Sequence, residues 1–124
     1  MTLTKLAKAA VAALEDIKGR DIVVLDVRKL TAFFDKVVIA TADSNRQAAA
    51  MARNLQEKLK AQGAKILGVE GEKTGEWILV DFGDVIVHIM QPAIREHYNL
   101  EELWSPPRVA RKRAVKAVVA DART

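Results

Sequence analysis

A chain of 124 residues, 50% hydrophobic and 29% charged, is long enough to fold as one ordinary domain and too apolar to be a disordered chain. It has no cysteine, which excludes disulfides, thiolate catalysis and cysteine-ligated zinc. No apolar run approaches the roughly 20 residues of a membrane-spanning helix, and the N-terminus does not resemble a signal peptide, so we expect a cytoplasmic protein.

The net charge of +4 is unevenly distributed along the chain. Residues 105–124 hold six basic residues and one acidic residue, a net charge of +5, whereas residues 1–104 hold 14 basic and 15 acidic residues, a net charge of −1. The Ser105-Pro106-Pro107 step separates the two parts. We therefore predict a folded domain over residues 1–104 and a loosely attached or partly disordered basic C-terminal extension over residues 105–124.

The first half of the chain predicts a helix, two strands and a second helix. Apolar residues recur at helical spacing over residues 3–17, and Gly19 is well placed to end that helix. Asp21–Arg28 reads as a strand, and the nearly continuous apolar run Lys36–Thr41 reads as a second strand, expected at the centre of a sheet.

The second helix has start, face and stop signals. Asp43 or Ser44 caps it, and Gln47 follows Ser44 at the spacing of a capping box. Gly63 is placed to end it. Its buried face is expected to consist of three residues at intervals of four, namely Met51, Leu55 and Leu59.

The second half predicts a short strand, a hairpin and a short helix. Lys65–Val69 is the third strand, and a polar turn over residues 70–75 leads into two alternating runs joined at Gly83-Asp84. Pro92 ends the last strand and permits a helix from about Ala93. The element order α-β-β-α-β-β-β-α predicts a single layered α/β domain with a mixed five-stranded sheet flanked by helices.

The hairpin Trp77–Met90 has two different faces. A two-residue turn pairs Phe82 with Val85 and so places an apolar set on one face. The reverse face carries Trp77, Leu79 and Asp81 opposite Met90, His88 and Ile86. Such a mixed face is typical of an interaction surface. Burial of this face under a helix explains the pattern equally well.

Patterns typical of catalysis and of metal or phosphate binding are not found. The two histidines, His88 and His97, lack metal-site spacing, and no P-loop motif occurs. Asp81 and Asp84 straddle the hairpin turn, where Asp84 is better explained by turn chemistry than by metal binding. Ser44 lacks a nearby base and is better explained as a helix cap. We therefore expect neither cofactor nor metal.

The remaining candidates suggest a surface that binds another protein. Trp, Tyr, Arg and Met are enriched in such surfaces. Arg95 and Tyr98 lie three residues apart, hence on one side of the helix after the hairpin, although Arg95 alternatively pairs with Glu101 or Glu102 and Trp104 alternatively fills the core. The predicted binding residues are Glu70, Glu72, Trp77, Asp81, His88, Met90, Arg95 and Tyr98.

Residues 3–104 resemble the Iojap family of ribosomal silencing factors. The resemblance rests on several short motifs that occur together in this order: Gly68-Val69-Glu70-Gly71-Glu72, Trp77-Ile78-Leu79-Val80-Asp81, Gly83-Asp84-Val85-Ile86-Val87-His88, Met90, Arg95, Tyr98, Leu100-Glu101 and Leu103-Trp104.

The resemblance implies a non-enzymatic repressor of translation that acts when nutrients are scarce. Such a protein binds the large ribosomal subunit through ribosomal protein L-fourteen and prevents the small subunit from joining. The family has a nucleotidyltransferase-like fold, but the catalytic pattern of that fold is missing here. Thr41-Ala42-Asp43-Ser44 stands where Gly-Ser is expected, and Arg28 stands where a second carboxylate is needed after Asp26.

Two alternative functions stay open. One is a nucleotidyltransferase-type enzyme that uses Asp26, Asp81 or Asp84 with magnesium, which rests on analogy of architecture. The other is an RNA-binding module driven by residues 106–124, whose basic side chains are suited to contact ribosomal RNA. Self-association into a homodimer through the mixed hairpin face is a further expectation, because exposed apolar patches tend to be covered.

Overall fold

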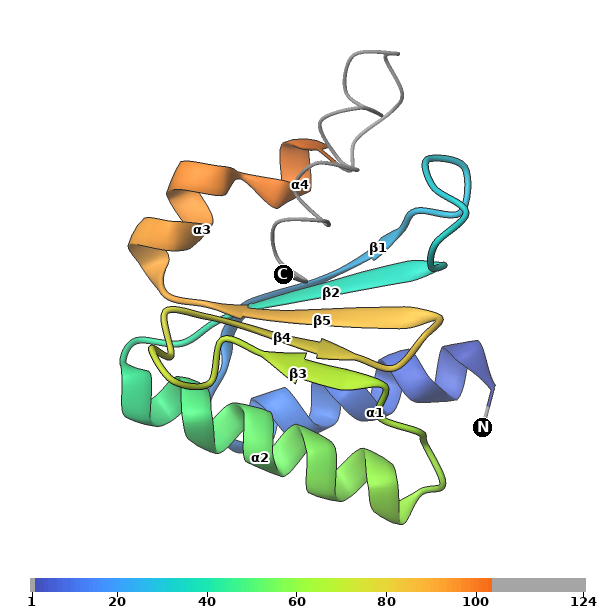
Figure 1. Cartoon of the computed structure of the whole chain (residues 1–124), viewed down its shortest axis with the longest axis horizontal. Helices are drawn as coiled ribbons and strands as arrows, with labels where there is room; N and C mark the ends of the chain where they lie inside the picture. The colour runs from blue at the N-terminus through green and yellow to red at the C-terminus, as the bar shows by residue number, and fades with distance from the viewer. Residues whose placement is uncertain (1, 104–124) are drawn as a thin grey trace.

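The computed structural model describes residues 2–103 as one α/β domain (Figure 1). In chain order its elements are α1 (Leu3–Asp16), β1 (Arg20–Asp26), β2 (Lys36–Thr41), α2 (Asn45–Ala61), β3 (Gly68–Glu70), β4 (Trp77–Asp81), β5 (Val85–Met90), α3 (Pro92–Tyr98) and α4 (Leu100–Leu103). The five strands form one sheet in the order β1-β2-β5-β4-β3. Strands β2 and β5 run parallel and every other neighbouring pair is antiparallel, so the predicted mixed five-stranded sheet is confirmed.

Strand β2 is an interior strand, as its continuous apolar run predicted, and lies between β1 and the middle strand β5. Two details of the sequence prediction are corrected. The third strand covers Gly68–Glu70 instead of Lys65–Val69, because residues 65 and 67 are exposed and only residues 68–70 align with β4. A second short helix, α4, follows α3 after Asn99, whose positive φ of 44° interrupts the helical path.

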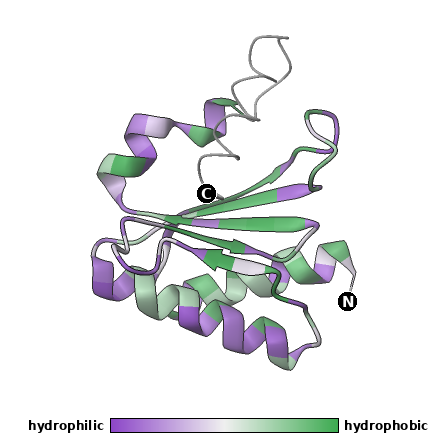
Figure 2. Cartoon of the chain, in the orientation of Figure 1, coloured by the Kyte–Doolittle hydropathy of each residue, from purple (hydrophilic) through white to green (hydrophobic). Residues whose placement is uncertain are grey.

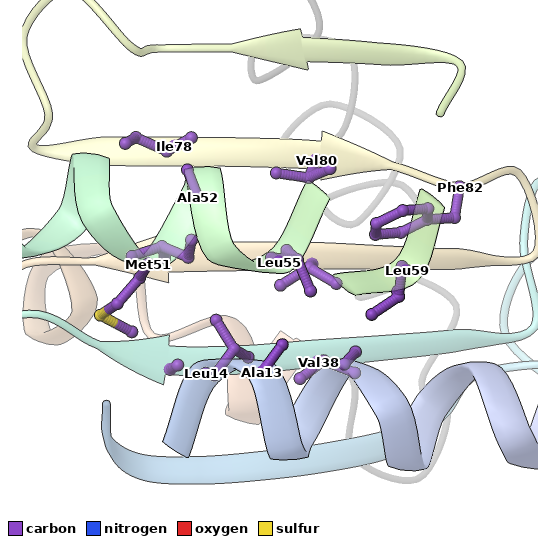
Figure 3. Packing of buried hydrophobic residues seen from close by; sticks show 14 of the residues in the cluster. Ala13, Leu14, Val38, Met51, Ala52, Leu55, Leu59, Ile78, Val80 and Phe82 are labelled. Carbon is purple, nitrogen blue, oxygen red and sulfur yellow. The ribbon is translucent and has the colours of Figure 1, made fainter. Parts of the chain in front are cut away.

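One face of the sheet is covered by α1 and α2, which pack against each other and against the strands (Figure 1). The predicted apolar stripe of α2 is buried in this layer (Figure 3), and the polar side of the helix faces away from the sheet (Figure 2). The core of this layer includes Leu14, Val38, Met51, Leu55, Leu59, Ile78, Val80 and Phe82.

The ends of α1 and α2 lie where the sequence predicted them, but the contacts at the start of α2 and at the end of α1 differ from those expected. Ser44 caps α2 and accepts a hydrogen bond from the Gln47 backbone N–H at 3.0 Å, but the Gln47 side chain accepts from the Asp43 N–H instead of the Ser44 N–H. Gly63 has a φ of +92° and ends α2 as expected. After α1 the left-handed position is Lys18, and Gly19 is needed for a different reason: a Cβ there would lie 2.9 Å from the Leu14 carbonyl oxygen.

The hairpin forms in the predicted register. Phe82 N–H donates to the Val85 carbonyl at 3.0 Å, and Ile78 and Trp77 lie opposite Ile89 and Met90. Gly83 has a φ of +88°, the conformation that favours glycine in a tight turn. The Ile78 side of the hairpin belongs to the α1 and α2 core. The local sequence therefore specified both the turn and the division of side chains between the faces.

The opposite face of the sheet forms a second buried cluster on the side where α3 and α4 lie (Figure 1). Leu100 of α4 is buried in this cluster, and Ile94 of α3 and Leu103 pack against it. Its sheet residues include Val37, Ile39, Leu79, Ile86 and Met90. Within residues 2–103 no helix is both long enough and apolar enough to cross a bilayer. The predicted extension and the core role considered for Trp104 lie outside these residues.

Candidate functional site

The mixed face of the hairpin is largely buried, as the alternative reading of the sequence allowed. His88 is 1% exposed and Met90 is fully buried, so neither side chain belongs to the surface that a partner would touch. Leu79 and Ile86 are buried beside them. The sequence pattern did not decide between exposure and burial, because the covering residues are brought there by packing beyond the hairpin.

Trp77 is the half-buried side chain at the border between this cluster and the surface. Its indole N–H donates to Nδ1 of His88 at 2.9 Å, and the two ring centroids are 5.8 Å apart. Trp77 also lies directly opposite the buried Met90 in the strand register. His88 and Met90 therefore hold Trp77 from the neighbouring strand β5, and the hydrogen bond to His88 fixes the orientation of the indole ring.

Tyr98 completes an aromatic pair with Trp77 at the surface. The two ring centroids are 4.7 Å apart with an interplanar angle of 51°, and Tyr98 keeps 41% of its surface exposed. His97 meets Tyr98 edge to face at 5.0 Å and is exposed as well. We call Trp77, His97 and Tyr98 the aromatic patch. His97 was considered in the sequence only as a metal ligand, and its position beside Tyr98 depends on where α3 lies.

Arg95 does not join the aromatic patch. Its side chain is 12% exposed and pairs with Glu101 at 2.8 Å, one of the two partners that the sequence suggested. The same guanidinium donates to Oγ1 of Thr41 at the end of β2, at 2.7 Å. Arg95 therefore connects α3 to α4 and to the sheet, and we call these three residues the Arg95 latch.

The three predicted acidic residues lie in three different places. Glu70 pairs with Leu79 in the strand register and so lies on the face of Trp77, at the edge of the sheet. Asp81 lies on the same face, about 13 Å along β4 from Trp77. Its carboxylate accepts from the Gly83 N–H at 2.8 Å, so Asp81 makes the turn contact that the sequence assigned to Asp84. Glu72 lines a hollow on α2 with Arg53 and Lys60 and is not part of the patch.

The loop between β3 and β4 positions the aromatic patch through residues that the sequence did not single out. A Cβ on Gly71 would lie 1.9 Å from the Trp77 carbonyl oxygen, so only glycine allows this approach. Gln91 joins the loop to the start of α3: its backbone N–H donates to the Glu76 carbonyl and its side chain donates to the Gly75 carbonyl, each at 3.0 Å. The one feature of the sequence that could have pointed to Gln91 is its position just before Pro92.

Asp26, one of the three carboxylates considered for magnesium, is engaged in an ion pair. Asp26 is bound by Arg28 at 2.6 Å, and this hydrogen-bonded guanidinium lowers the pKa of the Asp26 carboxyl from 3.8 to about 2. Asp43, which the sequence suggested only as a helix cap, is paired with Arg20, whose hydrogen bond lowers the pKa of the Asp43 carboxyl. Among residues 2–103, no three His, Asp or Glu side chains are grouped in a way that suits a metal ion. The feature of these residues that suits binding is instead the aromatic patch.

Comparisons with known proteins agree on one family. A family model described as "Ribosomal silencing factor during starvation" matches residues 1–124. The protein named "Ribosomal silencing factor RsfS" in Chromobacterium violaceum is 53% identical over 104 residues, which cover 84% of this chain and 85% of the relative. Its namesake in Haemophilus influenzae is 45% identical over 100 residues, 81% of this chain and 98% of the relative.

A more distant relative and a solved structure extend this picture. A mouse protein named "Mitochondrial assembly of ribosomal large subunit protein 1" is 35% identical over 98 residues, which cover 77% of this chain and 43% of the mouse protein. The crystal structure of a Chromobacterium violaceum protein superimposes with a TM-score of 0.83 at 51% identity, covering 87% of this chain and 90% of the other. The fold and the sequence therefore identify the same relatives.

Proposed function

Because the chain belongs to the family of ribosomal silencing factors (RsfS), we propose that it binds the large ribosomal subunit through ribosomal protein L-fourteen and thereby prevents the small subunit from joining. Binding that occupies the intersubunit surface represses translation without chemical turnover. No catalytic or cofactor site is needed for this function. The likeness to nucleotidyltransferases implied by the family resemblance stays a prediction about the fold alone.

The observation that carries the proposal is the aromatic patch. Trp77 and Tyr98 contact each other at the surface, and a hydrogen bond to the buried His88 of the neighbouring strand holds Trp77 in place. A preformed, well-packed aromatic pair loses little conformational freedom on binding, and Trp and Tyr are enriched among residues that dominate binding energy. This makes the aromatic patch the best-supported place for a protein partner.

The charges around the aromatic patch favour a basic partner. Glu70 lies on the same sheet face as Trp77, and the exposed Glu76 directly precedes Trp77 in the chain. Ribosomal proteins are generally basic, so an acidic rim accelerates their encounter and disfavours acidic competitors. The predicted residues Asp81 and Glu72, which lie further away, are proposed to contribute to this long-range attraction and not to contact.

A binding experiment with purified L-fourteen tests the proposal. Tyr98→Ala is expected to weaken binding by more than about 1 kcal/mol, roughly fivefold, because it removes the exposed half of the pair. Leu67→Ala is the matched control, since Leu67 is 61% exposed but lies directly before β3, outside the aromatic patch. Equal affinities of wild type and Tyr98→Ala in calorimetry would refute the assignment of the patch.

Trp77→Ala is less suited to this experiment. Its indole fills part of the second cluster and donates to buried His88, so truncation changes stability and binding together. Trp77→Phe keeps the ring contact with Tyr98 and loses the hydrogen bond. We expect it to bind L-fourteen with an affinity between those of wild type and Tyr98→Ala.

A further inference from the structure

The outer edge of strand β1 carries an exposed apolar side chain, Val24. Val24 keeps 42% of its surface exposed, although it lies on the sheet face covered by α1 and α2, opposite Val38 of the core. Strand β1 is the last strand of the sheet on this side, so within residues 2–103 its outer edge has no neighbouring strand. Such an edge is a template for pairing with another chain unless it is protected.

The register shows which backbone groups face that edge. Val27 N–H donates to the Asp35 carbonyl at 2.9 Å, which makes residues 27 and 35 a hydrogen-bonded pair. In an antiparallel ladder such pairs alternate, so Leu25 with Val37 and Val23 with Ile39 are hydrogen-bonded too. The N–H and C=O groups of Val24 and Asp26 therefore face outward. The irregular pairing between Arg20 and Val23 protects only the other end of β1.

A hollow of about 300 Å³ lies beside this stretch of edge. Its apolar part consists of Ala7 and Val11 of α1 together with Val24, and Thr4 completes the wall. Lys8 and Lys36 line the same hollow. A strand added to β1 would therefore present one side chain to an apolar hollow that is lined in part by two lysine side chains.

The charged side chains at this edge indicate which kind of partner segment binds there. Asp26 is the carboxylate that lies opposite Lys36 in the strand register, and it is already bound by Arg28 at 2.6 Å. Lys8 and Lys36 have no ion pair within 4.0 Å among residues 2–103, and Lys36 acts on the Asp26 carboxylate only at longer range, so both ammonium groups can still bind a partner's carboxylate. Carboxylates two residues before and after an apolar residue of an added strand would lie on the same face and reach these lysines.

Two other occupants suit the edge less well. A second copy of this chain paired β1 to β1 would place two sets of Lys8 and Lys36 on the same face of the joined sheet, where they repel each other. A helix lying in the hollow would leave the outward N–H and C=O groups of Val24 without partners from the added chain. An extended acidic segment satisfies both the backbone and the charges.

We propose that β1 accepts an extended segment of a partner protein as a sixth strand, with an apolar side chain in the hollow beside Val24 and flanking carboxylates on Lys8 and Lys36. The surface is independent of the aromatic patch and of the function proposed for it. Such strand addition takes its affinity from main-chain hydrogen bonds and its specificity from alternate side chains.

Synthetic peptides test this surface on the full-length protein. The probe is fluorescein-labelled Ser-Glu-Thr-Val-Thr-Glu-Ser, in which both glutamates share a strand face with valine. The matched probe has lysine in place of each glutamate. We expect the glutamate peptide to bind at least about tenfold more tightly in fluorescence anisotropy and to slow amide hydrogen exchange at Val24 and Asp26. A glutamate peptide N-methylated at valine loses one ladder hydrogen bond and should bind more weakly.

Variants of the protein distinguish peptide binding at the edge of β1 from non-specific binding. Val24→Lys should reduce glutamate-peptide binding at least about tenfold, whereas Leu67→Lys, at an exposed leucine away from β1, should not. Replacing both lysines, Lys8→Glu with Lys36→Glu, should reverse the preference between the two peptides. Thermal unfolding of each variant verifies that the fold is retained.

Several results would overturn the proposal. These are the absence of saturable binding, equal binding of the two peptides, unchanged binding to Val24→Lys, or exchange protection at residues other than those of β1. Protection of the Val24 amide that increases with protein concentration and needs no peptide would instead assign the edge to a second copy of the chain. The affinity for L-fourteen is measured separately and bears on none of these outcomes.

Discussion

Two contacts of single atoms hold Trp77 in its position. Its carbonyl oxygen lies so close to Gly71 that any side chain there would collide, and its indole N–H is taken up by His88. The sequence predicted Trp77 as a site residue from its place in the hairpin, because strand alternation is a local property. It did not predict the burial of His88 and Met90, since burial depends on residues distant in the chain.

Replacing Gly71 by alanine should destabilise the protein strongly. The φ of +86° is strained for alanine, and the added Cβ would overlap the Trp77 carbonyl oxygen, so we expect a loss of about 3 kcal/mol in the free energy of unfolding. Gly63→Ala is the control: its φ is +92° but no atom lies within 4 Å of the added Cβ, so about 1 kcal/mol is expected. Equal losses in urea denaturation would contradict the contact with Trp77.

The ion pair between Asp26 and Arg28 predicts a specific acid dependence. Because the folded pKa of Asp26 is about 2 and its ordinary value is 3.8, its stabilising contribution is complete above pH 3.8 and disappears as the pH falls towards 2. The melting temperature of wild type should therefore exceed that of Asp26→Asn at pH 6, and the difference should shrink over that window. A difference that stays constant between pH 6 and pH 2 would show that Arg28 does not perturb Asp26.

At the scale of elements, the hairpin and the helices α1 and α2 were predictable, whereas the position of α3 and α4 was not. Alternation, the Gly83 turn and the spacing of Met51, Leu55 and Leu59 are all encoded within a few residues of each other. The place of α3 depends on contacts far apart in sequence, such as Arg95 with Thr41 and Gln91 with Gly75. The sequence did predict the pairing of Arg95 with Glu101, because the two residues are only six apart.

Breaking the Arg95 latch should loosen α3 and α4 without unfolding the domain. Arg95→Met removes the ion pair with Glu101 and the hydrogen bond to Thr41, each worth about 1 kcal/mol. Amide hydrogen exchange should therefore accelerate roughly tenfold or more in α3 and α4 and stay unchanged in α1 and α2. Arg28→Met, at an exposed ion pair, is the control and should leave α3 exchange unaltered. Uniform acceleration across the domain would argue against a local latch.

At the scale of the whole molecule, the two faces of the sheet have different roles. The face under α1 and α2 holds the main core, and the face towards α3 and α4 ends in the aromatic patch. The family was recognisable from the sequence because its motifs occur together around the hairpin. The composition of the patch was only partly predictable, since Trp77 and Tyr98 lie at the surface while Glu72 lies by α2 and Arg95 is held in the latch.

The basic segment over residues 105–124, which the sequence predicts to be a C-terminal extension, offers a separate test of which part of the chain dominates binding. If the aromatic patch dominates, replacing Arg111, Lys112 and Arg113 by glutamine should weaken binding to the large subunit less than Tyr98→Ala does. If phosphate contacts dominate, the triple variant should lose more affinity than Tyr98→Ala does. The salt dependence of its binding should then correspond to the release of about three fewer counterions. Co-sedimentation with large subunits at two salt concentrations distinguishes the two cases.

The most direct test of the proposed silencing function measures subunit joining. Purified large and small subunits are mixed with increasing wild-type protein or with Tyr98→Ala, and joined ribosomes are quantified by light scattering. We expect wild type to reduce joining in proportion to its occupancy of the large subunit and Tyr98→Ala to require at least about fivefold more protein. Unimpaired joining when the large subunit is saturated with wild-type protein would contradict the account.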